Sequence, residues 1–132
     1  MKNCSRITIF SHWTPNTNQP GGYLIGKWEH DKWLYGGYHW TNDSLYIGRF
    51  DEYKRCGVGL FKYGLGDLYI GFWKDDKKDG YGTYKYKNGA LYEGSWTRNL
   101  KSGQGKMTYA NLDVFQGYWK INKKEGYGRY EQ

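Results

Sequence analysis

Histidine, cysteine and acidic side chains carry most catalytic and metal-binding chemistry, and in this chain they are scattered. The three histidines, His12, His30 and His39, have no HExxH motif around them and no i, i+4 spacing. A helical zinc site or a positioned acid–base pair would need such spacing. Cys56 has no histidine near it in the sequence that could activate its thiol. The pattern predicts a non-enzyme with no metal and no cofactor.

Positive charge is the second feature that could do chemistry. The formal net charge is +7, and the segments 97–102 and 120–125 carry +2 each. Aligned on one edge of a repeating structure, these segments would either form a solvated edge or attract an anionic surface, such as phosphoinositide headgroups or an acidic protein. The basic residues of this candidate edge are Arg98, Lys101, Lys120, Lys123 and Lys124.

Two stretches imitate the aromatic strand on which RNA-binding domains stack bases. Residues 79–86 and 125–130 both contain a Gly-Tyr-Gly core. An acid stands where that motif has lysine or arginine, and no helical pattern flanks either stretch. We therefore do not expect nucleic acid to be a partner.

Glycines and aromatic residues recur with a period of 23 residues, the strongest pattern in the chain. A segment of the form Tyr-x-Gly-x-Trp begins at residues 46, 69, 92 and 115, and a Gly-x-Gly pair starts nine residues after its glycine. A worn copy begins at residue 24, with Tyr35 in place of a pair glycine. The defining positions are Tyr46, Gly48, Gly57, Gly59, Tyr69, Gly71, Trp73, Gly80, Gly82, Tyr92, Gly94, Trp96, Gly103, Gly105, Gly117, Trp119, Gly126 and Gly128.

Each repeat predicts two short antiparallel strands. Residues 80–86 alternate, Asn88 and Gly89 mark a hairpin turn, and residues 91–96 return. A polar segment of six residues, such as 74–79, is expected to carry the chain to the next hairpin. Because no stretch has a period of 3.6, the fold class is all-β, a stack of hairpins that bury their rings against their neighbours.

Strand alternation separates a ring face from an opposite face that changes along the chain. Rings such as Tyr92 and Trp96 share the first face, with glycines opposite them. The other face is apolar in its first half and polar in its second. A single-layer sheet needs only one apolar face, so its apolar residues are either covered by the alternating segment 7–10 or exposed for protein docking. They are Ile47, Val58, Leu60, Ile70 and Phe72.

A Tyr-x-Gly-x-Trp segment, a polar loop, a Gly-x-Gly pair, an aromatic strand and a turn in each 23 residues resemble the MORN repeat (membrane occupation and recognition nexus). The likeness covers roughly residues 23–130, and turns 41–44 and 110–113 lack the usual glycine. It implies an elongated, twisted, single-layer antiparallel sheet of about five hairpins with a groove. It also implies use as a scaffold, adaptor or membrane-proximal module.

The predicted organisation is a segment 1–22, acting as a cap strand or an extension, followed by a repeat domain 23–132. The predicted function is a non-catalytic scaffold that binds protein partners within a larger assembly. The alternative is a peripheral membrane adaptor that binds acidic phospholipids through the basic edge. The repeats lie near residues 24–45, 46–68, 69–91, 92–114 and 115–132.

The cysteines and the first residues bear on location. Cys4 and Cys56 make no disulfide framework, and residues 1–13 contain no apolar core for a secretory signal. We expect an intracellular, cytoplasmic protein, which is compatible with association with the cytoskeleton, a cilium or a membrane. The basic start, free of acids up to Glu29, leaves a mitochondrial presequence as an alternative.

Overall fold

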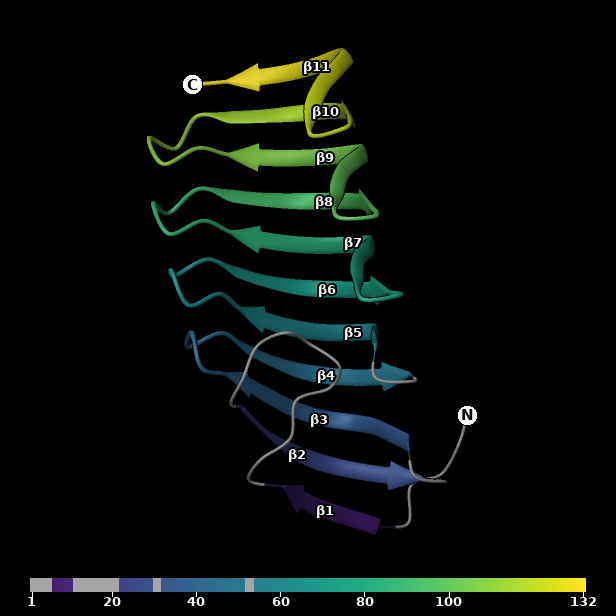
Figure 1. Ribbon diagram of the computed structural model, residues 1–132. Helices are drawn as coiled ribbons and strands as arrows, with labels where there is room; N and C mark the ends of the chain where they lie inside the picture. The colour runs from purple at the N-terminus through teal and green to yellow at the C-terminus, as the bar shows by residue number, and fades with distance from the viewer. Residues whose placement is uncertain (1–5, 11–21, 30–31, 52–53) are drawn as a thin grey trace.

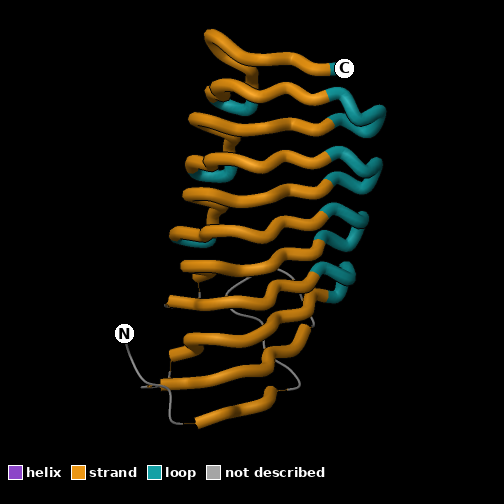
Figure 2. Tube along the Cα trace, turned by 180° about the vertical axis from the view of Figure 1, so that it is seen from behind, coloured by secondary structure: helices purple, strands orange, loops and turns teal. Residues whose placement is uncertain are grey.

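The computed structural model describes residues 6–10, 22–29, 32–51 and 54–132. Its eleven strands form one sheet in which each strand pairs with its neighbours in the sequence (Figure 1). All pairs are antiparallel, and the described residues contain no helix (Figure 2). The predicted all-β, single-layer sheet of stacked hairpins is confirmed. The strands are β1 (Arg6–Phe10), β2 (Gly22–Glu29), β3 (Lys32–Trp40), β4 (Leu45–Asp51), β5 (Lys54–Lys62), β6 (Leu68–Lys74), β7 (Lys77–Lys85), β8 (Leu91–Thr97), β9 (Leu100–Thr108), β10 (Val114–Lys120) and β11 (Lys123–Glu131).

The connections differ at the two ends of the strands. Residues 86–90 join β7 to β8, closed by a hydrogen bond from Tyr86 N to Ala90 O of 2.9 Å. The Asn88 side chain accepts from Ala90 N at 2.9 Å, as asparagine does in an Asx turn. The hairpin predicted at Asn88 and Gly89 therefore forms, with a turn wider than two residues.

At the other end, the predicted six-residue polar loops are wrong. β6 runs to Lys74 and β7 resumes at Lys77, so only Asp75 and Asp76 form the turn. Their φ angles are 49° and 69°, and Arg98–Asn99 and Ile121–Asn122 repeat this left-handed pair. Two successive positive φ values make the turn whose twist matches that of the flanking strands. Asp and Asn tolerate this conformation, so polar residues build a tight turn here.

The core lies on the ring face and repeats with the sequence. Tyr46, Tyr69 and Tyr92 are fully buried. Each phenol donates a hydrogen bond to the carbonyl three residues ahead, as Tyr69 Oη does to Phe72 O at 2.9 Å. This bond lays the ring over the neighbouring glycine pair, which for Tyr69 is Gly71 and Gly82.

Tryptophan joins one repeat to the next. Trp96 packs edge-on against Tyr92 of its own repeat, with ring centroids 5.2 Å apart, and against Tyr69 of the preceding repeat at 5.6 Å. Its indole N–H donates to Gly82 O at 3.3 Å. Trp73 and Trp119 make the equivalent bonds to Gly59 and Gly105. Each hairpin is therefore fixed to its neighbour by ring contacts as well as by the strand ladder.

β1 extends the sheet at its first edge. It pairs with β2 in a regular register, with Ile9 opposite Ile25 and Phe10 opposite Leu24. A strand hydrogen-bonded at this edge lies in the plane of the sheet and leaves the face of β4–β6 uncovered. The expectation that segment 7–10 covers the apolar face is therefore wrong. Residues 1–5 and 11–21 of the predicted N-terminal segment, with Cys4 and His12, lie outside the described residues, as does His30.

The space above the glycines gives the first prediction. A Cβ atom added to Gly82 would overlap the Tyr69 ring, whereas one added to Gly37 would meet Tyr46 O at 3.5 Å, an ordinary contact. We expect Gly82→Ala to lower the free energy of unfolding by about 1–3 kcal/mol, because the ring must move. Gly37→Ala is the matched control and should change it little. Chemical denaturation of both variants measures the difference, and equal effects would contradict this packing.

Candidate docking face and basic edge

The five apolar residues of the predicted docking surface come together in the structure. Ile47 of β4 lies opposite Leu60 of β5, and Leu60 lies opposite Ile70 of β6. Val58 lies opposite Phe72 in the same pair of strands. Directly opposed residues share a face and stand close together. The five side chains form one patch on three adjacent strands, called here the apolar patch.

The apolar patch is open to solvent. Phe72 is 48% exposed and Val58 57%, with Ile47 and Ile70 in the same range and Leu60 half-buried. A contiguous set of large apolar side chains on a surface usually marks an interaction site. Tyr81 of β7, 58% exposed, continues the patch by one strand.

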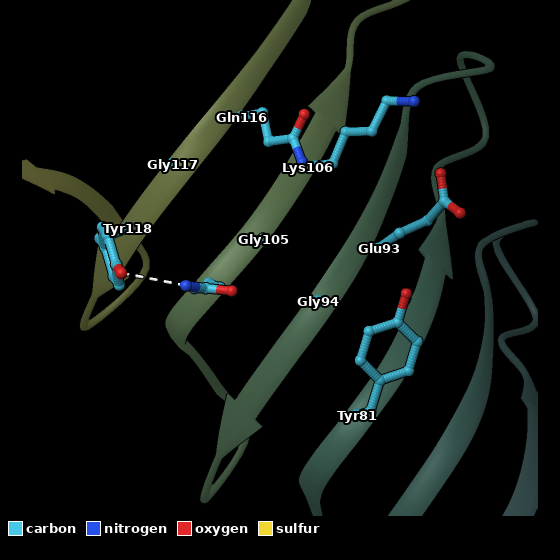
Figure 3. A pocket seen from close by; sticks show the side chains of 9 residues that line it. Tyr81, Glu93, Gly94, Gly105, Lys106, Gln116, Gly117 and Tyr118 are labelled. Carbon is cyan, nitrogen blue, oxygen red and sulfur yellow. Dashed lines mark hydrogen bonds between the residues drawn. The ribbon is translucent and has the colours of Figure 1, made fainter. Parts of the chain in front are cut away.

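Beyond Tyr81 the same face is polar and hollowed. Strands β7–β10 hold a shallow groove of about 400 Å³ whose side chains stand on one side of the sheet (Figure 3). The Gln104 amide donates to the Tyr118 hydroxyl across its floor at 3.0 Å. Glu93 and Lys106 face each other from β8 and β9. The change from apolar to polar that the sequence predicts for this face is therefore present in space.

The predicted basic edge is divided between two places. Arg98 and Lys120 lie at the exposed ends of strands or turns, as does Lys123, and Lys120 lies 4.0 Å from Glu125. Lys101 and Lys124 turn onto the ring face instead. The Lys101 ammonium lies 5.2 Å from the Tyr92 ring centroid and 5.3 Å from that of Trp119. The Lys124 ammonium lies 4.7 Å from the Phe115 ring.

Lys101 and Lys124 belong to a series that the sequence reasoning missed. Arg55, Lys78, Lys101 and Lys124 are spaced by 23 residues, and each cation lies over rings of the core. A cation over an aromatic face is attracted by the ring quadrupole. The common phase of these four residues within the repeat is the signal that could have identified them. They are called here the cation series.

The backbone around the cation series is held by the tight turns. Arg55 pairs with the Asp76 carboxylate, which also accepts from Arg55 N at 3.1 Å. Asn99 stands one repeat later and accepts from Lys78 N at 2.8 Å. Asparagine keeps the hydrogen bond and removes the charge, so no described carboxylate forms a salt bridge with Lys78.

Burial changes the protonation of the ring face. Burial, followed by the nearby charges of Lys101 and Arg55, lowers the pKa of Lys78 from 10.5 to about 8. Burial also raises the pKa of Tyr92 to about 12 and raises that of Tyr46 and Tyr69. The shifts favour the neutral form of each group, as removal from water does.

The described residues offer no arrangement for catalysis. Burial raises the pKa of the half-buried Cys56 thiol, which disfavours the nucleophilic thiolate. The described part of the chain contains no group of three His, Cys, Asp or Glu side chains placed to hold a metal. Nor does it contain a helix long and apolar enough to cross a membrane.

The comparisons with known proteins agree with the geometry. Four consecutive stretches match the family model of the MORN repeat, at residues 46–67, 69–91, 92–114 and 115–131. They correspond to the hairpin units from β4 to β11. The comparison with curated proteins gave no match.

The protonation of the ring face gives the second prediction. From about pH 8 the folded chain loses the Lys78 proton that the unfolded chain keeps up to its pKa of 10.5. The free energy of unfolding should therefore rise as the pH increases from about 8 towards 10. Above pH 10 it should fall, because unfolded tyrosines ionise while the buried ones stay protonated.

Denaturation curves measured from pH 7 to 11 test this dependence. Lys78→Met keeps an unbranched side chain over the rings without the charge, so it should reduce the rise and leave the fall. A stability that declines steadily from pH 8 in the unmodified protein would contradict the lowered pKa.

Proposed function

Because the chain belongs to the MORN repeat family, we propose that it is a scaffold that binds a protein partner through the apolar patch. MORN repeats serve as scaffold or membrane-binding modules and are generally non-catalytic. The proposal places the protein as a structural piece of a larger intracellular, cytoplasmic assembly. The exposed apolar patch is the observation that supports it most.

The architecture explains why the patch is available. The buried core consists of ring-face residues, so the hairpins do not depend on Ile47 or Phe72 for their packing. Large apolar side chains kept on a face that the core does not use cost solubility and are typical of an interface. Phe72 stands opposite Val58 and beside Tyr81, and such aromatic side chains commonly anchor binding.

The basic edge is the weaker candidate site. Two of its five predicted members, Lys101 and Lys124, are committed to the ring face. The remaining cations share the edge with acids, since Asp75 and Asp76 form the preceding turn of the same kind. Attraction to an anionic membrane grows with the number of cations near its surface. The placement of these charges favours a protein partner over acidic lipid.

Replacement of two patch residues tests the proposal. Ile47→Asp with Phe72→Asp should weaken binding of a stoichiometric partner, purified with the chain from its native source, by at least about thirtyfold, or about 2 kcal/mol. Leu65→Asp with Leu112→Asp is the matched control, because these leucines are 85% and 77% exposed in turns away from the patch. Binding is measured by titration calorimetry, and folding by circular dichroism.

Two outcomes would contradict the proposal. Unchanged affinity in the folded patch variant would show that the partner docks elsewhere. Cosedimentation with phosphoinositide vesicles that is abolished by Arg98→Glu, Lys120→Glu and Lys123→Glu, together with no protein partner, would assign the function to the basic edge.

A further inference from the structure

The centre of the docking face is a strip of bare backbone between two rows of side chains. Glycines lie directly opposite one another on successive strands, from Gly48 on β4 to Gly117 on β10. The residues before and after each glycine point to the docking face. The first row holds Ile47, Leu60, Ile70, Glu93, Lys106 and Gln116. The second holds Val58, Phe72, Tyr81, Gln104 and Tyr118.

The spacing of the two rows limits what can lie between them. Residues that flank a glycine on one strand are about 6.7 Å apart along it, whereas an α-helix with side chains is about 10–12 Å wide. A helix would therefore rest on top of the rows. An extended chain fits between them, and the groove over Gly94, Gly105 and Gly117 is the part already hollowed (Figure 3).

The direction of the strip fixes how an extended chain would be recognised. The strip crosses the strands, and their backbone groups are already used in the ladder of the sheet. A peptide lying along it cannot add a strand, so it must be recognised through its side chains. From β4 to β10 the strip crosses six strand intervals of about 4.8 Å, roughly 29 Å, which about nine extended residues span.

The chemistry of the two halves indicates the sequence of that peptide. The β4–β6 half presents the apolar patch. The β8–β10 half presents the amides of Gln104 and Gln116 and the exposed ammonium of Lys106, which forms no salt bridge with a described residue. The net charge of +7 favours an acidic ligand over a basic one.

Resting on the proposed function, we infer that the partner contributes an extended peptide segment, apolar at one end and acidic at the other. Its apolar side chains lie on the apolar patch, and its carboxylate lies at Lys106, with neighbouring polar groups at Gln104 and Gln116. The segment crosses the strands above the glycine strip.

Selection of random peptides on the full chain tests this inference. Peptides displayed on phage, long enough to cross the strip, should be enriched for apolar residues followed or preceded by an acid. Lys106→Glu should weaken the selected peptides by roughly threefold to tenfold, as expected for an exposed charge pair. Replacing the acid of the peptide with lysine should restore binding to the Lys106→Glu chain. Lys120→Glu, an exposed reversal on the basic edge, is the control and should have no effect.

The contrary results are separable from failure of the proposed function. No enrichment of peptides, an increase in helix content on binding, or equal affinity for the Lys106→Glu chain would overturn the inference. If the native partner is still lost from the Ile47→Asp, Phe72→Asp chain in these cases, the apolar patch docks a protein without an extended segment in the groove. If that variant binds its partner normally, the proposed function fails as well.

Discussion

A tyrosine ring that lies over two neighbouring glycines is the contact on which the rest of this structure depends. Tyr69 crosses above Gly71 and Gly82 and anchors its hydroxyl on Phe72 O at 2.9 Å. No side chain fits under the ring, so both positions require glycine. The tryptophan of the next repeat can then pack edge-on against this tyrosine, as Trp96 does. The 23-residue period is the sequence record of this contact repeated from hairpin to hairpin.

The contact also explains how one layer of sheet can hold together. Rings supply the buried apolar surface on one face, and each hairpin packs only against its neighbours, as in other repeat proteins. The cation series closes this face, with Lys78 lying 4.6 Å from the Trp96 ring. Because the core is complete on the ring face, the opposite face is available for binding. Its change from Phe72 to Lys106 is a property that the repeat itself does not require.

Much of the fold could be predicted because it is written in short-range alternation. Tyr92, Gly94 and Trp96 at every second position define the ring face, and the opposition of rings and glycines follows from it. The turn at Asp75 and Asp76 could not be predicted in this way, because polar residues suit a long loop as well as a tight left-handed turn. Lys101 was assigned to the edge by charge alone, whereas a bulge at the strand start directs it over Tyr92 and Trp119. The edge pairing of β1 depends on backbone hydrogen bonds, which Ile7–Phe10 could have exchanged for side-chain packing.

The central claim is that the ring face alone stabilises the fold and the apolar patch serves binding. Its most direct test is the unfolding midpoint of a chain with threonine at all five patch positions, Ile47, Val58, Leu60, Ile70 and Phe72. Threonine suits strands, so the variant separates loss of apolar surface from loss of strand preference. The account predicts cooperative unfolding with a midpoint close to that of the unmodified chain. Loss of cooperative unfolding would show that the patch is part of the core and would contradict the account.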